Sequence, residues 1–321
     1  MDYIFDCRIT ESTLNGIVKS FVPERDVYYF DDESIANTCL HCGLPVYSRQ
    51  EFASTFPLFA LNYGSVYHLW SMKLPKDAMV LVAHPSEFGY LPADIQKKLL
   101  RQQIEYGRGH IYDMDWFDLL QLPHLRTAEF EGMPYYFLTW DDWWKFTPEV
   151  RKLWVIEWLR EWRKEDAGVT GFVDFPHHHE EVPYELIEEY AGTFGPASTS
   201  NCFAAAIAMV VGVRNTDQSH VLISEWLHQG PFFRLLDEQG YVQYADYIDV
   251  DDMTFQPTDV LVWYTEDGIA GHAGYAVSHE LVFQKQAQGW DNPWQVLKIH
   301  DVWYNEYLKT GGHITVFRRN G

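Results

Sequence analysis

The sequence predicts an α+β protein whose C-terminal half combines helices with an antiparallel sheet. The chain has 321 residues, 47% of them hydrophobic, which is enough for two domains with separate cores. Short aromatic and apolar runs separated by polar turns fill the first 80 residues and favour short strands over long helices. From Asp259 onward, apolar runs are joined by short turns, which indicates antiparallel neighbours.

Three short strands and one helix are predicted within the first 104 residues. Apolar or aromatic residues run almost without a break at residues 27–30, 65–70 and 78–83, and each run has the length of a strand. Residues 91–104 have the periodicity of an amphipathic helix, with a proline near the first position. We therefore expect an irregular α+β arrangement here.

A longer helix is predicted over residues 147–164. It opens on Thr147-Pro-Glu149, which supplies a capping hydroxyl, a proline at the first helical position and an acid at the positive end of the helix dipole. Along it, Trp154, Trp158 and Trp162 recur every four residues and form one aromatic face. Such a face is typical of a core or a domain interface.

The first domain is predicted to end at residue 168. The charged residues 160–166 and then Gly168 close the tryptophan helix, so the chain divides into an aromatic-rich α+β domain, residues 1–168, and a second domain, residues 169–321. The residues themselves assign no role to the first domain. In the second we predict helices at 183–190, 202–210 and 219–228, followed by strands at 260–264, 272–277, 281–284 and 314–317.

Charge and composition exclude several classes of protein. A formal net charge of −22 disfavours nucleic acid and anionic membrane surfaces as partners, because phosphates would be repelled. We find neither a basic segment followed by an apolar one at the N-terminus nor an apolar run of about 18 residues. Four cysteines are too few for a disulfide scaffold and fit a reducing compartment. A soluble, cytoplasmic protein is expected.

Two histidine- and cysteine-containing segments have the composition of metal sites. Cys39-Leu-His-Cys42 has the spacing of half a zinc site or of a redox pair, but the chain holds no second cysteine pair. Residues 174–181 contain three consecutive histidines, whose side chains would point in different directions on an extended segment. We expect a pair of ordinary thiols and a solvated linker, with no metal and no cofactor.

Cys202 is the candidate nucleophile. Polar residues 198–201 offer N-caps, and the small apolar residues after Cys202 predict a helix buried on nearly all sides. In the first turn, unpaired backbone N–H groups and the helix dipole favour a thiolate and can receive an oxyanion. The alternative is a buried structural cysteine, since a free cysteine usually belongs to the core.

A cysteine nucleophile needs a base, and the base needs a group that orients it. His272 opens a predicted strand and Gln284 lies twelve residues later on the next one, so the two side chains can be cross-strand neighbours on one sheet face. We expect that face to pack against the start of the Cys202 helix. If Gln284 is not the orienting residue, Asp291 or His300 is the next candidate.

The order of these motifs resembles the NlpC-type papain-like cysteine peptidases. A cysteine at a helix start is followed by Pro257-Thr-Asp-Val-Leu-Val262 and then by His272-Ala-Gly-Tyr-Ala-Val277. The resemblance covers residues 183 to 321 and implies a catalytic set of Cys202, His272 and Gln284. The sequence departs from the family pattern in having Phe203-Ala after the cysteine, Thr258 in place of glycine, and glutamine at the third position.

The resemblance implies a thiol peptidase or amidase. Such an enzyme cleaves an amide bond through an acyl-enzyme intermediate, and the family acts typically on cell-wall peptides. The substrate is then a peptide or another amide, whereas the substrate-binding residues and the oligomeric state are left open. Two alternatives are an acyltransferase of the same superfamily and a non-catalytic binding or scaffolding protein in which the cysteine and histidine are incidental.

Overall fold

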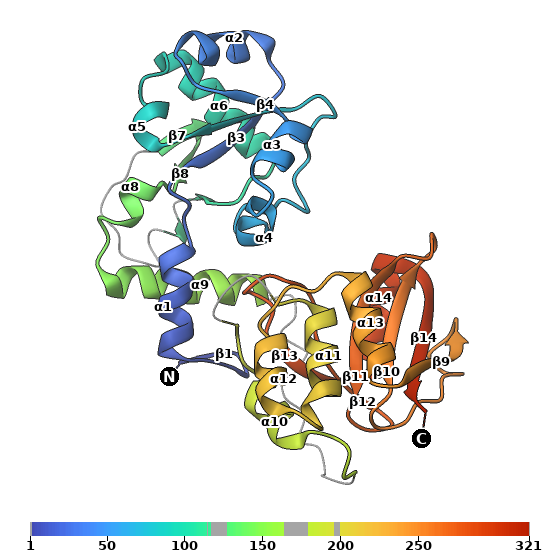
Figure 1. Ribbon diagram of the computed structural model, residues 1–321. Helices are drawn as coiled ribbons and strands as arrows, with labels where there is room; N and C mark the ends of the chain where they lie inside the picture. The colour runs from blue at the N-terminus through green and yellow to red at the C-terminus, as the bar shows by residue number, and fades with distance from the viewer. Residues whose placement is uncertain (1, 114, 117–126, 164–178, 196–199, 321) are drawn as a thin grey trace. The chain divides into compact units, whose positions relative to one another are not determined.

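The computed structural model describes residues 2–113, 115–116, 127–163, 179–195 and 200–320 of a mixed α+β chain. It divides into two compact units (Figure 1). One unit comprises Asn15–Trp158, and the other joins Met1–Leu14 to Leu159–Gly321. The predicted division at residue 168 did not anticipate that the first strands belong to the C-terminal unit. There the backbone N–H of Arg8 donates to the carbonyl of Gly192 at 2.6 Å.

Two three-stranded antiparallel sheets form the strand framework of the Asn15–Trp158 unit. In one the strand order is β3-β5-β4, and in the other it is β6-β8-β7. The strands are β3 (Asp26–Phe30), β4 (Val46–Ser48), β5 (Met79–Ala83), β6 (Ile111–Tyr112), β7 (Thr127–Phe130) and β8 (Met133–Phe137). The helices that begin or lie in this unit are α2 (Glu33–His41), α3 (Arg49–Thr55), α4 (Phe59–Tyr63), α5 (Pro85–Phe88), α6 (Ala93–Glu105), α8 (Trp140–Trp143) and α9 (Pro148–Arg163), with α1 (Glu11–Ser20) crossing its start.

The predicted strand at residues 65–70 is wrong. These residues form turns after α4, in which the N–H of Tyr67 donates to the carbonyl of Tyr63 and the N–H of His68 to that of Ser65. His68 also has a φ of 56°, which an extended strand does not allow. Local hydrogen bonds here outcompete the strand preference of the valine and the aromatic residues, whereas β3, β5, α6 and α9 confirm the other elements predicted for this half.

The tryptophan face of α9 belongs to the core. Trp154 and Trp158 are buried, and their rings lie against those of Phe21, Tyr112 and Trp143 in mostly edge-on contacts. This confirms the expected core role for these two residues. The side chain of Trp162 lies outside the described part of the chain.

A buried ion pair links two segments of this unit that are 82 residues apart in the sequence. The guanidinium of Arg108 lies 3.1 Å from Asp26 Oδ1 and donates to the carbonyl of Val27 at 2.8 Å. The hydroxyl of Tyr67 donates to the same carboxylate, and Arg108 also lies over the Tyr67 ring. Burial lowers the pKa of the adjacent His110 to about 3, so its ring is neutral at neutral pH.

The C-terminal unit is organised around a six-stranded antiparallel sheet of order β13-β12-β11-β10-β14-β9. Its strands are β9 (Tyr241–Tyr247), β10 (Val260–Thr265), β11 (Ala270–Ala276), β12 (Leu281–Lys285), β13 (Trp294–Lys298) and β14 (Gly311–Arg319), and a separate pair is formed by β1 (Asp2–Ile4) and β2 (Cys7–Ile9). The helices are α10 (Tyr184–Tyr190), α11 (Cys202–Gly212), α12 (Thr216–Leu222), α13 (Gln229–Glu238) and α14 (Ile299–Thr310).

The two faces of this sheet bury different helices (Figure 1). Val260 and Val262 of β10 belong to the cluster formed with α11, whereas Leu261 and Trp263 belong to the cluster formed with α14. This alternation is the period-two pattern of a strand buried on both sides. The four predicted strands and the antiparallel arrangement are confirmed, whereas β9, β13 and α14 were not predicted.

No helix among the described residues is long and apolar enough to cross a membrane.

Candidate active site

Cys202 is the first residue of α11 because Asn201 caps the helix. Asn201 is extended, with φ −121° and ψ 179°, and its Oδ1 accepts from the N–H of Ala204 at 3.0 Å. Its Nδ2 donates to the carbonyl of Leu227 at 2.8 Å, and Oδ1 also receives the N–H of Leu227. The cap therefore fixes the helix start and ties it to the segment before α13.

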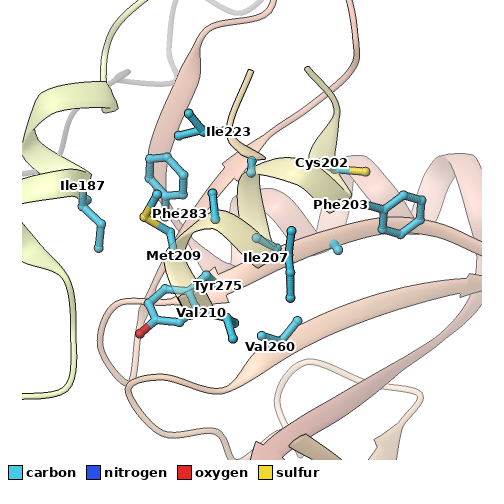
Figure 2. Close-up of a cluster of buried hydrophobic side chains, with 14 of the residues drawn as sticks. Ile187, Cys202, Phe203, Ile207, Met209, Val210, Ile223, Val260, Tyr275 and Phe283 are labelled. Atoms are coloured by element: carbon cyan, nitrogen blue, oxygen red, sulfur yellow. The ribbon is translucent and has the colours of Figure 1, made fainter. Parts of the chain in front are cut away.

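Helix α11 is buried along its whole length apart from Gly212. Every residue from Cys202 to Val211 is buried, and the small side chains of residues 204–206 let the helix approach the sheet closely. Figure 2 shows Ile207, Met209 and Val210 among the core side chains, with the Cys202 sulfur directed away from them. The sequence predicted this helix correctly from its small apolar residues.

The Cys202 sulfur lies against the backbone of β11. Burial raises the pKa of the thiol, whereas the backbone N–H of Ala273, the residue that follows His272, favours the thiolate. Successive N–H groups of a strand point alternately to its two neighbouring strands. The N–H of Val277 donates to the carbonyl of Leu281 on β12 and that of Ala276 to Asp259 next to β10, so the N–H of Ala273 points toward β12. The β11–β12 register ends at Tyr275 and Phe283, so β12 no longer pairs with Ala273.

His272 and Gln284 share one face of the sheet, as predicted. His272 pairs directly with Trp263 on β10, and their ring centroids are 5.2 Å apart. Gly274 lies two residues after His272 on β11 and therefore on the same face. A Cβ built on Gly274 would lie 3.7 Å from the Gln284 Cβ, so Gln284 shares this face as well. Both side chains are buried.

That face is not the one covered by α11, which corrects the predicted packing. Trp263 belongs to the cluster with α14, and a directly paired residue points to the same side as its partner. His272 and the body of α11 therefore lie on opposite faces of the sheet.

Burial dominates the acidity of Cys202. It raises the pKa of the thiol to about 12, although the backbone N–H groups of Ala273, Phe203 and Cys202 itself favour the thiolate. The carboxylate of Glu306 raises the pKa further. The expectation that the helix start would produce a low pKa is therefore wrong for the resting protein, because loss of solvation outweighs the backbone dipoles.

Lys285 is a buried charge that the sequence analysis missed. Its Nζ donates to the carbonyls of Ala287 at 2.6 Å and Gly289 at 2.7 Å, and the side chain is fully buried. Burial lowers the pKa of this ammonium to about 7. A charged residue at an inward-facing position, two residues after Phe283 on a buried strand, was the available signal.

The loop after β12 borders the candidate site. The indole N–H of Trp226 donates to Gln288 Oε1 at 3.0 Å, which joins this loop to the segment before α13. Asp291, an alternative third residue, is buried and accepts from Asn292 Nδ2 at 2.8 Å. His300, the other alternative, is exposed on α14.

The cysteine pair of the first half lies apart from any metal-binding group. Cys39 is buried in the core of the Asn15–Trp158 unit, whereas Cys42 is exposed at the end of α2. In the described part of the chain, no three histidine, cysteine or acidic residues are grouped as a metal site would require. Most of the histidine run at residues 174–181 lies outside the described residues.

The chain matches no known protein family, no curated protein and no solved structure.

Proposed function

We propose that the protein is a thiol hydrolase that cleaves an amide bond with Cys202 as nucleophile. The observation that supports this most is the position of the cysteine sulfur beside the Ala273 N–H, one residue from His272. His272 and Gln284 share a sheet face, as a base and its orienting residue should. The proposal therefore takes its nucleophile from a helix start and its base and orienting residue from two neighbouring strands.

The proposed reaction has two steps. His272 takes the thiol proton as the sulfur attacks the amide carbonyl, and the backbone N–H groups near the sulfur hold the oxyanion. When the C–N bond breaks, His272 returns that proton to the leaving amine. His272 then accepts a proton from water, which attacks the thioester and restores the thiol.

A detail of the backbone supports a papain-like relationship of the NlpC type. Thr258 has a φ of 77°, a left-handed conformation that glycine adopts freely and a β-branched residue rarely does. It stands where the NlpC-type pattern has glycine. Thr258 therefore has the backbone conformation that a glycine at this position of the family pattern would adopt.

Two other functions are weighed against hydrolysis. An acyltransferase would use the same groups, with an alcohol or amine in place of water. A binding or scaffolding protein is favoured by one observation, the burial of Cys202, which leaves 7% of the residue exposed and keeps its thiol protonated at neutral pH. The alkylation rate of Cys202 distinguishes a binding or scaffolding protein from a hydrolase or an acyltransferase.

We expect Cys202 to alkylate faster than the exposed Cys42 near neutral pH. If Cys202 behaved only as a buried thiol with a pKa of about 12, Cys42 would react first, because Cys42 is exposed and the Cys202 thiol is buried and protonated. A base that accepts the Cys202 proton reverses this order by about tenfold or more. Iodoacetamide labelling followed by peptide mass spectrometry gives both rates, with Cys39 as the buried control. Slower labelling at Cys202 than at Cys42 contradicts the hydrolase proposal.

Gln284 is expected to act through His272. Its Oε1 is buried and accepts no hydrogen bond among the described residues, so the bond to the imidazole N–H has to form in the substrate complex. Gln284→Ala should lower turnover by about one to two orders of magnitude with little loss of folding. Gln284→Glu should raise the pKa of His272 and move the acidic limb of the pH–rate profile upward.

The pH–rate profile of each variant on a fluorogenic peptide amide measures both effects. Gln288→Ala, in the following loop, is the matched control. Parental rates and pH dependence in both Gln284 variants would assign the third position to another residue.

A further inference from the structure

Lys285 and Cys202 approach the same point from two elements. Continuing the β11–β12 register by two residues places Lys285 opposite Ala273, whose N–H meets the Cys202 sulfur. Side chains alternate between the two faces along β12, so Lys285 points to the face opposite that of Gln284 and to the same face as Phe283. Phe283 belongs to the core cluster that contains Cys202. The lysine therefore lies on the α11 side of the sheet, while His272 lies on the other.

The Lys285 ammonium is held in place and away from water. Two backbone carbonyls, those of Ala287 and Gly289, accept its hydrogen bonds, and the side chain has no exposed surface. Neutral carbonyls orient an ammonium without cancelling its charge. In a poorly solvated site that charge acts on its neighbours far more strongly than it would in water.

Resting on the proposed function, we propose that Lys285 is a positioning residue whose ammonium stabilises negative charge on the Cys202 sulfur. The thiol proton still passes to His272, and no bond to Lys285 is made or broken. The position of Lys285 on the sheet face that carries the Cys202 cluster supports the assignment, and so does the burial of its ammonium. Burial lowers the pKa of Lys285 to about 7, while Asp291 and Cys202 raise it, which agrees with this placement. This charge offsets part of the burial that disfavours the thiolate.

The interaction has a defined dependence on pH. Below a pH of about 7 the lysine is charged and favours the thiolate, and above it the charge and the benefit are lost. Two other titratable groups act on the pair: Asp291 from the loop on Lys285, and Glu306 from α14 on Cys202. Substitutions at Lys285 leave these groups unchanged, so a comparison of variants isolates the lysine.

The first test is the pH profile of Cys202 alkylation in the full chain. Lys285→Met keeps the length of the side chain without its charge, and Lys285→Arg keeps the charge. The methionine variant should alkylate about tenfold more slowly near pH 7, and its ratio of iodoacetate to iodoacetamide rates should fall, because the anionic reagent loses an attracting charge. The arginine variant should retain most of that ratio. Unchanged profiles and ratios in a folded Lys285→Met variant would overturn the proposal.

A second test leaves Lys285 in place, so it decides the matter if the methionine variant fails to fold. The ¹³Cε resonance of Lys285 is titrated in the parent, in Cys202→Asp and in Cys42→Asp. A carboxylate at position 202 carries the negative charge that the protonated thiol lacks near pH 7, so the pKa of Lys285 should rise, while Cys42→Asp should leave it unchanged. An identical Lys285 titration in the parent and Cys202→Asp rules the coupling out. Neither measurement needs a substrate, so an absence of turnover would refute the proposed function alone.

Discussion

Cys202→Ala is expected to abolish amide hydrolysis, with a loss of at least about a thousandfold. Without the sulfur no acyl-enzyme forms, and His272 with the backbone N–H groups leaves only a small residual rate. The change removes one buried atom at the first position of α11 while Asn201 still caps the helix, so the fold should persist. The rate is measured on a panel of fluorogenic peptide amides, with folding checked by circular dichroism.

Two control variants test whether the loss of hydrolysis is specific to the Cys202 thiol. Cys42→Ala removes an exposed thiol in the other unit and should retain the parental rate. Cys202→Ser keeps a hydroxyl at the same place but should be almost as inactive as alanine, because the hydroxyl is a far weaker nucleophile near neutral pH. Hydrolysis that survives in both Cys202 variants would place the activity elsewhere in the chain.

Arg108→Met is expected to destabilise the Asn15–Trp158 unit by about 3–5 kcal/mol. The substitution leaves the Asp26 carboxylate buried without its ion-pair partner and the carbonyl of Val27 without a donor. It also removes a cation from the face of the Tyr67 ring. The loss of stability should appear in β3, because this strand carries both Asp26 and Val27, the two partners of Arg108.

Amide hydrogen exchange in β3 and β5 measures this loss without requiring the two units to unfold together. Arg101→Met is the matched control, since Arg101 forms an exposed pair with Glu105 at 3.0 Å and should contribute less than about 0.5 kcal/mol. Arg108→Lys retains the charge but loses the planar group that reaches both oxygens, so it should fall between the two. Equal exchange rates in Arg108→Met and Arg101→Met would show that the buried pair is not needed.

Local sequence alone determined the helix that carries the candidate nucleophile. Asn201 followed by small apolar residues specifies a cap and a buried helix through contacts within four residues, so no distant information was needed. The start of α9 at Thr147 and Pro148 was equally local. The strands around His272 and Gln284 also followed from their residues, because alternation and short turns are encoded in neighbouring positions.

Tertiary structure decided which face of the sheet each group occupies. Residue spacing places His272 and Gln284 on one face but does not say which helix covers that face. Likewise, the high pKa of Cys202 comes from burial by distant segments, which outweighs the local helix dipole. The sequence shows Lys285 only as a charged residue at an inward-facing strand position, and it is the carbonyls of Ala287 and Gly289 in the following loop that hold its ammonium in the interior. Solvation depends on the whole fold, so no local pattern encodes it.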